Sequence, residues 1–291
     1  MLKVSVVLPA KNEAGGLERV IPALVGMGIF DEIIVVDDGS VDQTSTVASG
    51  FGAKVIHHPY SKGNGAAIKS GVRAATGDII VFMDADGQHQ PEDIPDLLEK
   101  LDEGYDMVVG SRSGSSQASV GRWAANSFYN RLATFMVGHK VEDLTSGLRV
   151  VRAKKFREFL YLLPNGFSYP TTSTMAFFRA GYSVGYCRIT TLKREGKSHI
   201  NPIRDGLRFL LIIFKIGTLY SPLKLFVPFS FCFFSLGMGY YLFSFLASGR
   251  FTNMSALLLS TAVIVFLIGL VSEQITNLMY QGTVSDKDRN Q

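Results

Sequence analysis

The chain has 291 residues, of which 47% are hydrophobic and 19% charged, and its formal net charge is +4. This length allows one sizeable globular domain with a smaller appendage. A basic balance suits phosphate-bearing substrates and anionic lipid headgroups. The sequence has no dense Lys/Arg block of the kind that binds nucleic acid, which argues against nucleic acid as a partner.

Five short segments predict β-strands, at residues 3–9, 32–36, 54–57, 79–83 and 107–110, and most of them are near-continuously apolar. Helical segments are expected between them, at residues 13–26, 42–49, 66–75 and 93–101. Strands that alternate with helices predict an α/β fold, with a mainly parallel sheet that is covered by helices on both faces.

Polar clusters follow three of these strands at the point where each strand ends, at residues 9–13, 37–40 and 84–89. In open α/β sheets, ligands bind at the carboxyl ends of the strands. We therefore expect the three clusters to meet on one rim of the sheet and to form the active site of an enzyme.

Asp84 and Asp86 leave a buried strand two residues apart, so their carboxylates can bind one hard cation. Such a cation, Mg²⁺ or Mn²⁺, would neutralise the charge of a diphosphate. Gln88 and His89 follow closely enough to complete the coordination. The alternative interpretation is a solvated turn at the end of the strand.

Three other strand-end groups are candidates for binding a nucleotide. Asp37 and Asp38 could bind a ribose or a base, or simply cap a helix and form a turn. The Lys-Gly-Asn-Gly loop that begins at Lys62 could wrap a phosphate with its backbone N–H groups, or be an ordinary loop. Arg112 ends another strand, where a guanidinium can bind diphosphate oxygens in a bidentate manner, although a surface arginine is the commoner case.

The C-terminal region is strongly apolar. Residues 225–248 and 251–272 contain no charged residue, and each stretch exceeds the roughly 20 residues that cross a ~30 Å hydrocarbon core. They predict two transmembrane helices, and the alternative is a hairpin buried in a protein core. Basic residues flank the pair, so the positive-inside rule places the large domain and both termini on the cytoplasmic side of the inner membrane. Glu273 is expected at the membrane interface.

Residues 202–220 carry apolar and charged side chains at helical spacing. This pattern predicts an amphipathic helix on the membrane surface, or else a helix packed on the globular domain. The predicted organisation is a cytoplasmic domain of residues 1–201, a juxtamembrane amphipathic helix of residues 202–222, a two-helix transmembrane anchor of residues 223–280 and a cytoplasmic tail of residues 281–291.

Seven segments of the large domain form a recognisable set: VVLPAKNE (6–13), VVDDGS (35–40), KGNGAAI (62–68), MDADGQHQPEDIP (83–95), VVGSR (108–112), EDLTSGLR (142–149) and REGKSH (194–199). Together they resemble the inverting family 2 glycosyltransferases of the GT-A fold, and most closely the dolichol-phosphate mannose synthases and the bacterial enzymes that make polyprenyl-phosphate sugars. The resemblance covers about residues 3–201. It implies a Rossmann-like GT-A fold and the transfer of a hexose from a nucleotide-sugar, with UDP-glucose or GDP-mannose favoured, to undecaprenyl or dolichyl phosphate.

The resemblance also implies roles for individual residues. Asp84 and Asp86 would bind the metal, with Gln88 as the third ligand. With the strand-end candidates included, the residues expected to contact the nucleotide-sugar are Pro9, Lys11, Glu13, Asp37, Asp38, Lys62 and Asp84. The residues expected to act in catalysis are Asp86, Arg112, Asp143 and Arg194. The residues expected near the acceptor phosphate are Arg122, Asn126 and Ser198.

Asp143 lies where many family members have a candidate base. A lipid phosphate is already ionised at pH 7, so a strong base is unnecessary, and Asp143 could instead orient the acceptor or a sugar hydroxyl, or cap the turn that follows it. Arg112, Arg122 and Arg194 would gather two phosphate groups that otherwise repel each other.

Two other functions fit the same fold. A processive polysaccharide synthase usually carries a Gln-x-x-Arg-Trp signature. Arg122 and Trp123 are present, but Gln117 lies five residues before Arg122, and two spans are few for a translocating channel. A catalytically silent membrane scaffold would have no need of the charged site residues. Relatives with two spans suggest a homo-oligomer.

Overall fold

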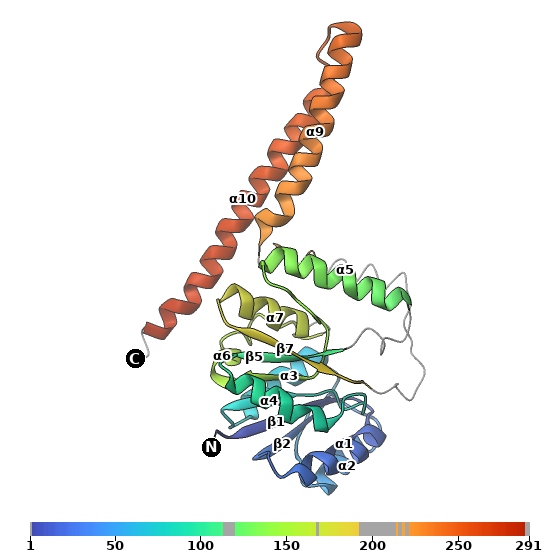
Figure 1. The fold of residues 1–291 in the computed structure, drawn as a ribbon, viewed down its shortest axis with the longest axis vertical. Helices are drawn as coiled ribbons and strands as arrows, with labels where there is room; N and C mark the ends of the chain where they lie inside the picture. Colours follow the sequence, from blue (N-terminus) through green and yellow to red (C-terminus); the bar gives the residue numbers. More distant parts are fainter. Residues whose placement is uncertain are drawn as a thin grey trace. The chain divides into compact units, whose positions relative to one another are not determined.

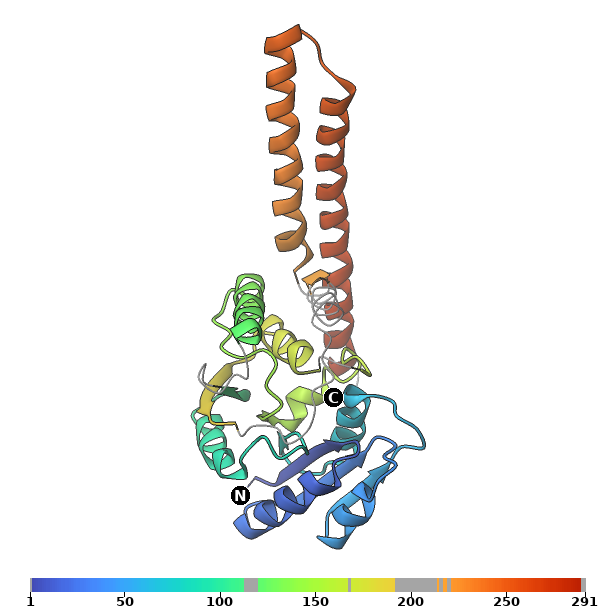
Figure 2. The same ribbon diagram turned by 90° about the vertical axis from the view of Figure 1, so that its right-hand side faces the viewer.

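The computed structural model describes residues 2–112, 120–166, 169–191, 214, 217, 218 and 221–288, with the backbone alone for residues 120–126 and 279–288. The chain divides into two compact units, Met1–Ile200 and Asn201–Gln291, and each unit is described by itself. The first unit is a sheet with helices packed on it, and the second is a pair of long helices (Figures 1 and 2). The predicted amphipathic helix at residues 202–222 lies almost entirely outside the described residues.

The sheet of the first unit has seven strands within the described residues, in the order β3-β2-β1-β4-β6-β5-β7. The strands are β1 (Val4–Ala10), β2 (Glu32–Asp37), β3 (Lys54–His57), β4 (Ile79–Phe82), β5 (Met107–Arg112), β6 (Arg149–Arg152) and β7 (Val184–Ile189). β6 pairs antiparallel with both β4 and β5, whereas the other pairs are parallel. The prediction of a mixed, mainly parallel sheet is confirmed, as are its five strands.

Helices cover both faces of the sheet, as predicted. They are α1 (Ala14–Met27), α2 (Thr44–Gly50), α3 (Asn64–Ala74), a 3₁₀ turn η1 (Pro91–Asp93), α4 (Ile94–Asp102), α5 (Val120–Val137), α6 (Ala153–Arg157) and α7 (Tyr169–Arg179). Side chains alternate along a strand, so successive residues of β1 and β4 point to opposite faces. This alternation builds two separate apolar layers.

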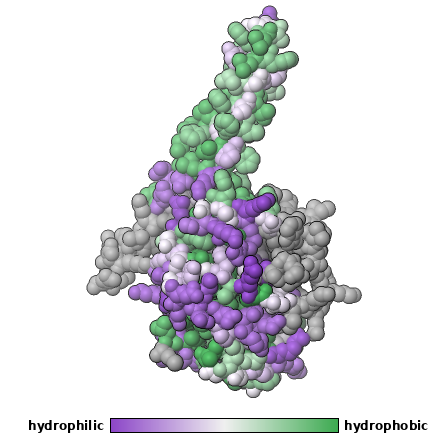
Figure 3. Space-filling view, in the orientation of Figure 1, coloured by the Kyte–Doolittle hydropathy of each residue, from purple (hydrophilic) through white to green (hydrophobic). Residues whose placement is uncertain are grey.

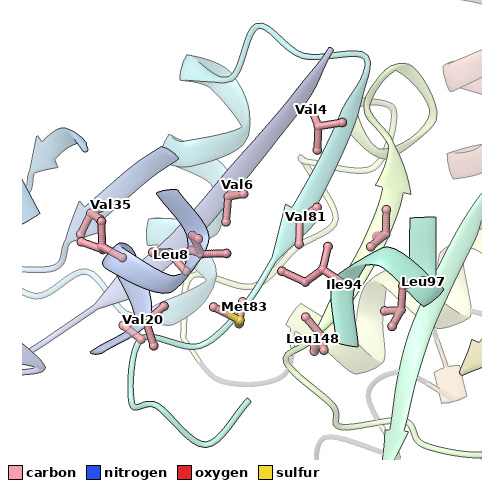
Figure 4. Close-up of a cluster of buried hydrophobic side chains, with 14 of the residues drawn as sticks. Val4, Val6, Leu8, Val20, Val35, Val81, Met83, Ile94, Leu97 and Leu148 are labelled. Atoms are coloured by element: carbon pink, nitrogen blue, oxygen red, sulfur yellow. The ribbon is translucent and has the colours of Figure 1, made fainter. Parts of the chain in front are cut away.

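One layer lies between the sheet and the helices α1, α2 and α4. Val6 and Leu8 of β1 and Val81 of β4 pack there against Val20 of α1 and Leu97 of α4, and all five are buried (Figure 4). This layer holds the sheet rigidly against the helices that follow β1 and η1. The carboxyl ends of β1 and β4 are therefore fixed relative to the start of α1.

The opposite layer contains the aromatic side chains that follow β6. Phe82 of β4 lies 4.7 Å from the ring centroid of Phe156 in α6 and 6.0 Å from that of Tyr169 in α7. Phe156 in turn packs against Phe177. Aromatic pairs at these separations stabilise the face beyond their area burial. They hold α6 and α7 under the antiparallel strand β6.

The described part of the second unit contains two long helices, α9 (Pro222–Ser248) and α10 (Asn253–Asp288). Two segments of them, Pro222–Ser248 and Asn253–Leu278, are long and apolar enough to cross a membrane. Most of their apolar side chains are exposed, unlike those of a core hairpin (Figure 3). The helices pack closely, since Ser230 Oγ donates to the carbonyl of Ala262 at 2.8 Å. The backbone of the predicted tail continues α10 as far as Asp288.

Glu273 has a structural role in this hairpin. Its Oε2 accepts the N–H of Leu223 at 3.4 Å, in the first turn of α9. The first N–H groups of a helix lack partners within the helix and carry partial positive charge. A carboxylate near the end of the second span therefore stabilises the start of the first span.

Candidate functional site

A pocket of about 350 Å³ lies at the carboxyl ends of β1, β2 and β4. The three predicted polar clusters all contribute to it. Its lining residues are Pro9, Ala10, Lys11, Glu13, Asp38, Ser61, Gly63, Asn64, Ala67, Asp84, Ala85 and Asp86. Of the residues predicted to contact a nucleotide-sugar, Asp37 and Lys62 are not among them. We call this the acidic pocket, because four carboxylates line it.

Two glycines position the Asp84–Asp86 segment. A Cβ atom on Gly16 would lie 2.1 Å from the carbonyl oxygen of Ala85, so the first turn of α1 rests directly on this segment. A Cβ atom on Gly147 would lie 2.1 Å from Oδ2 of Asp84. Only glycine permits backbone to approach this closely. The Asp84 carboxylate is thus enclosed on one side while its side chain stays 38% exposed.

Three basic side chains lie near Asp84. Burial acts to raise its pKa, but His89, whose Nε2 lies 3.8 Å from Oδ2, and the guanidinium groups of Arg112 and Arg149 outweigh burial and lower the pKa below its ordinary value. Asp84 is therefore ionised at neutral pH. An ionised carboxylate here is suited to bind a cation.

The donor set fits a hard divalent cation that keeps open positions. Asp84 and Asp86 supply carboxylates, and Gln88 follows with its N–H 3.1 Å from Oδ1 of Asp86. Across the described part of the chain, no three His, Cys, Asp or Glu side chains gather as a complete metal cage. Mg²⁺ commonly binds one or two carboxylates and takes its other ligands from water and phosphate. Buried Nδ1 of His89 has no hydrogen-bond partner among the described residues.

Asp38 lines the acidic pocket, and its carboxylate already accepts hydrogen bonds from four groups of the protein. Its Oδ1 accepts His58 Nδ1 at 2.7 Å and the N–H of Lys62 at 2.8 Å, and its Oδ2 accepts Ser61 Oγ and the N–H of Gly63, both at 2.8 Å. A carboxylate has about four lone-pair positions. Burial opposes ionisation, but these four donors lower the pKa of Asp38 to about 2. Asp38 therefore shapes the loop at residues 58–63.

The carboxylate of Asp37 is also occupied by hydrogen bonds within the protein. It is buried, accepts the N–H of Ser40 at 2.8 Å, and is hydrogen-bonded by Ser45 Oγ at the start of α2. Its Oδ2 also lies 3.3 Å from Nδ1 of His57. The turn-and-cap interpretation thus describes Asp37 in this structure, and the nucleotide contact stays a prediction.

The Lys-Gly-Asn-Gly loop is packed against another loop of the protein. The N–H groups of Lys62 and Gly63 donate to Asp38, that of Gly65 donates to the carbonyl of Gly166, and that of Ala66 donates to the carbonyls of Gly63 and Asn165. These four N–H groups are occupied, so a phosphate cradle formed by them does not fit this structure. The Lys62 ammonium lies 5.7 Å from the ring centroid of Tyr60.

Asn12 braces the rim of the acidic pocket, although it was not among the residues predicted from the sequence. It has a positive φ of 55°. Its N–H donates to Ser40 Oγ, and its Oδ1 accepts the N–H of Val41, both at 2.9 Å. Asparagine tolerates this left-handed conformation better than most residues. The pair of bonds fixes Lys11 and Glu13 on either side of it.

A second pocket, of about 620 Å³, lies beside the end of β5. It is lined by Ser111, Arg112, Ser127, Asn130, Arg131, Thr134, Lys140, Val141, Glu142 and Arg188. We call it the cationic pocket, because four basic side chains surround it with one acid. Only Arg112 of these was predicted as a site residue, because β7 and the end of α5 carry no motif that the sequence alone reveals.

Arg112 is held by Asp143. Its Nε lies 2.8 Å from Oδ2 and its Nη2 lies 3.0 Å from Oδ1, and Nη2 also donates to Thr145 Oγ1 at 2.6 Å. Asp143 is only 5% exposed, and it accepts the N–H groups of Thr145 and Ser146 as well. Burial would raise the pKa of Asp143, but the Arg112 guanidinium and the backbone N–H groups of Thr145 and Arg112 lower it.

Arg149 is fully buried, and its acidic neighbours are Asp84 and Asp143. Its guanidinium donates to the carbonyl of Ser146 at 2.6 Å, to that of Pro170 at 2.9 Å and to Ser173 Oγ at 2.9 Å. Burial lowers the pKa of Arg149. Neutral oxygens compensate this buried cation, which in turn contributes positive charge near Asp84. The EDLTSGLR segment contains it, but nothing in that segment reveals that it is buried.

The structure leaves part of the predicted acceptor site undescribed. Arg122 and Asn126 lie on α5, where only the backbone is described, and Arg194 and Ser198 lie outside the described residues. Their predicted roles therefore stay predictions.

Comparison with known proteins identifies the family. A model of glycosyl transferase family 2 matches residues 5–160, which is more than half of the chain. The chain belongs to glycosyl transferase family 2. A second model, the GtrB C-terminal hairpin, matches residues 221–278, which contain α9 and most of α10. The resemblance inferred from the seven segments is thus confirmed.

Among the relatives of this family 2 member is a dolichol-phosphate mannosyltransferase of Pyrococcus furiosus, which is 38% identical over 184 residues, or 57% of this chain and 50% of the relative. An undecaprenyl-phosphate 4-deoxy-4-formamido-L-arabinose transferase of Klebsiella pneumoniae is 38% identical over 160 residues, or 52% of this chain and 49% of the relative. The chain spans about half the length of each.

The predicted GT-A architecture also has a solved counterpart. Glucosyl-3-phosphoglycerate synthase of Mycobacterium tuberculosis, in complex with Mn²⁺ and UDP-glucose, superposes with a TM-score of 0.60 and 26% identity. The match covers 73% of this chain and 77% of that one. The prediction of a GT-A fold is confirmed.

Proposed function

We propose that this glycosyltransferase moves a hexose, with inversion at C1, from a nucleotide-sugar to a polyprenyl phosphate. The observation that carries the proposal is the pairing of the acidic and cationic pockets within one unit. Asp84 lines the first pocket and Arg112 the second, and the two side chains are close enough for each to shift the pKa of the other. Such a pair can hold a donor diphosphate with a cation and an acceptor phosphate with arginines.

The acidic pocket would bind the donor. Lys11 and Glu13 line its rim, while Asp84 and Asp86 would hold Mg²⁺ or Mn²⁺, with Gln88 as a further ligand. When bound, such an ion stabilises the negative charge of the departing nucleoside diphosphate. We favour UDP-glucose or GDP-mannose as the donor. The Mycobacterium tuberculosis structure with Mn²⁺ and UDP-glucose, and the Pyrococcus furiosus mannosyltransferase, support these two choices.

The cationic pocket would bind the acceptor phosphate. Arg112, Arg131, Lys140 and Arg188 supply positive charge around it. The names of the two relatives, which include dolichol phosphate and undecaprenyl phosphate, support a polyprenyl phosphate as the acceptor. Arg122, Asn126, Arg194 and Ser198, whose side chains lie outside the described part of the structure, are proposed to complete this site.

The reaction then needs little help from a base. An oxygen of the lipid phosphate, already ionised, attacks C1 of the sugar, and the bond between C1 and the nucleotide diphosphate breaks. Asp143 is engaged with Arg112 and with two backbone N–H groups. We therefore assign Asp143 the role of orienting Arg112 toward the phosphate rather than that of removing a proton.

The anchor would bring the enzyme to its lipid. We propose that α9 and α10 cross the inner membrane, with the catalytic unit and both termini on the cytoplasmic side, and that the enzyme acts as a homo-oligomer. Two helices of sufficient length, and the match to the GtrB hairpin, support the membrane location. Lys224 at the start of α9 supports the orientation by the positive-inside rule.

The test uses the full chain in detergent with undecaprenyl or dolichyl phosphate, Mg²⁺ or Mn²⁺, and a panel of radiolabelled nucleotide-sugars. Label should enter the organic phase from one donor, and it should disappear with EDTA or in Asp86→Ala. Asp102→Ala, which removes an exposed carboxylate at the end of α4, is the matched control and should keep activity. If folded protein transfers nothing to lipid from any donor, the proposal fails. Release of free sugar polymer would instead indicate a polysaccharide synthase.

A further inference from the structure

The turn that carries Asp143 is held from one side by helix α5. The side-chain amide of Asn130 donates from Nδ2 to the carbonyl of Glu142 at 2.6 Å, and its Oδ1 accepts the N–H of Leu144 at 3.1 Å. One amide therefore binds the residues immediately before and after Asp143. It uses a donor and an acceptor at once, which asparagine supplies and neither aspartate nor alanine does.

A second residue of α5, Thr134, also binds the segment that carries Asp143. Oγ1 of Thr134, one turn after Asn130, accepts the N–H of Val141 at 3.0 Å and donates to the carbonyl of Asn130 at 2.7 Å. Residues 141–144 are thus attached to α5 at three backbone positions. Asn130 and Thr134 both line the cationic pocket as well.

The turn at residues 142–145 in turn fixes the position of the Arg112 guanidinium. Asp143 binds the guanidinium through both of its oxygens, at 2.8 and 3.0 Å, and Thr145 adds a third contact at 2.6 Å. A bidentate pair fixes the direction of a guanidinium as well as its distance. A shift of residues 142–144 would therefore move Arg112 relative to the pocket that it lines.

We propose that Asn130 is a positioning residue for the acceptor site, which holds Asp143, and through it Arg112, in register with α5. The same helix carries Arg122 and Asn126, so Asn130 links the two halves of the proposed phosphate site. This inference rests on the proposed function for its consequence in catalysis. The inference about how Arg112 is held does not depend on the proposed function, because the chemical reactivity of Arg112 can be measured without any transfer assay.

Ser183, the residue before β7, offers a matched control. Ser183 accepts the N–H of Asp106 at 3.1 Å and donates to the carbonyl of Gly104 at 3.2 Å. It therefore also clamps a turn through one donor and one acceptor, but at the start of β5, the end opposite Arg112. Ser183→Ala removes these contacts, together with one from Ser183 Oγ to Oδ2 of Asp106 at 3.2 Å, without reaching either pocket.

The experiment compares wild type, Asn130→Ala, Asn130→Asp and Ser183→Ala as full chains in detergent. The first readout is the rate at which phenylglyoxal modifies Arg112, measured by mass spectrometry of the peptide. Arg112 should react several-fold faster in the Asn130 variants than in wild type. In Ser183→Ala it should react at the wild-type rate, even if this variant loses as much Tm as the Asn130 variants do. Asn130→Asp keeps the acceptor for Leu144 and the side-chain shape, so the test stands if the alanine variant does not fold.

The second readout separates acceptor from donor. The KM for polyprenyl phosphate should rise about tenfold in the Asn130 variants, while the Kd for UDP or GDP with Mn²⁺ changes less than about twofold. Arg112 reactivity equal to that of Ser183→Ala, or an equal loss of nucleotide affinity, would overturn the inference. If the wild type transfers no sugar to lipid, the proposed function fails, whereas the Arg112 rates still decide the role of Asn130.

Discussion

Replacing Asp38 with asparagine tests how the acidic pocket is built. In the structure its two carboxylate oxygens accept four donors, from His58, Ser61, Lys62 and Gly63. An amide has the same shape, but its NH₂ group would face two of these donors instead of accepting from them. The loop at residues 58–63 would then lose the group that organises it.

The magnitude follows from the pKa. The folded value for Asp38 is about 2, against an ordinary value of 3.8, and about 1.4 kcal/mol per pKa unit gives the ionised carboxylate roughly 2.5 kcal/mol of stability at neutral pH. Because the folded pKa is lowered, this contribution is fully present above about pH 5, falls to about half at pH 3 and is nearly lost at pH 2. The asparagine side chain of the variant has no charge to titrate over that range.

Thermal unfolding in detergent, followed by circular dichroism, measures this effect. Asp38→Asn should lower the Tm by about 5–10 °C at pH 7, and the difference from wild type should shrink as the pH falls from 4 to 2.5. Asp42→Asn changes an exposed carboxylate in the next turn and should cost about 1 kcal/mol or less. Equal losses for the two variants, or an Asp38 effect that does not change with pH, would refute the assignment of Asp38 as the organiser of the loop.

Two further substitutions test the glycine contact and the buried cation. Gly16→Ala should displace the carbonyl of Ala85, 2.1 Å from the new Cβ, and lower transfer at least tenfold, whereas Gly15→Ala, with nothing within 4 Å, should keep activity and stabilise α1 by about 1 kcal/mol. Unchanged activity in Gly16→Ala would contradict the close packing. Arg149→Lys should cost about 3 kcal/mol of unfolding free energy, measured by denaturant titration, because an ammonium cannot reach Ser146 and α7 together; a loss below about 1 kcal/mol would disprove that role.

The sequence alone was sufficient for the elements whose signal is local. Apolar runs marked β1, β2, β4 and β5, because a strand buried on both faces must be apolar over its own length. Asp84 and Asp86 were predicted at a strand end for the same reason. The edge strand β3 was predicted from the short segment Lys54–His57. The two C-terminal spans followed from length and composition. The strands β6 and β7 were missed, since four residues that begin and end with arginine, and a strand containing Tyr186 and Arg188, carry no such run.

The tertiary structure decided which groups meet. β6 inserts between β4 and β5 and runs antiparallel to both, which brings Gly147 and Arg149 against Asp84 although they lie more than 60 residues away. The same folding assigns the donors of Asp38 and joins Asn130 to the Asp143 turn. A residue type specifies how many hydrogen bonds a side chain can make, but its partners depend on how distant segments cross. For that reason the sequence indicated a carboxylate and an arginine at the site, and only the fold showed that Asp143 serves Arg112.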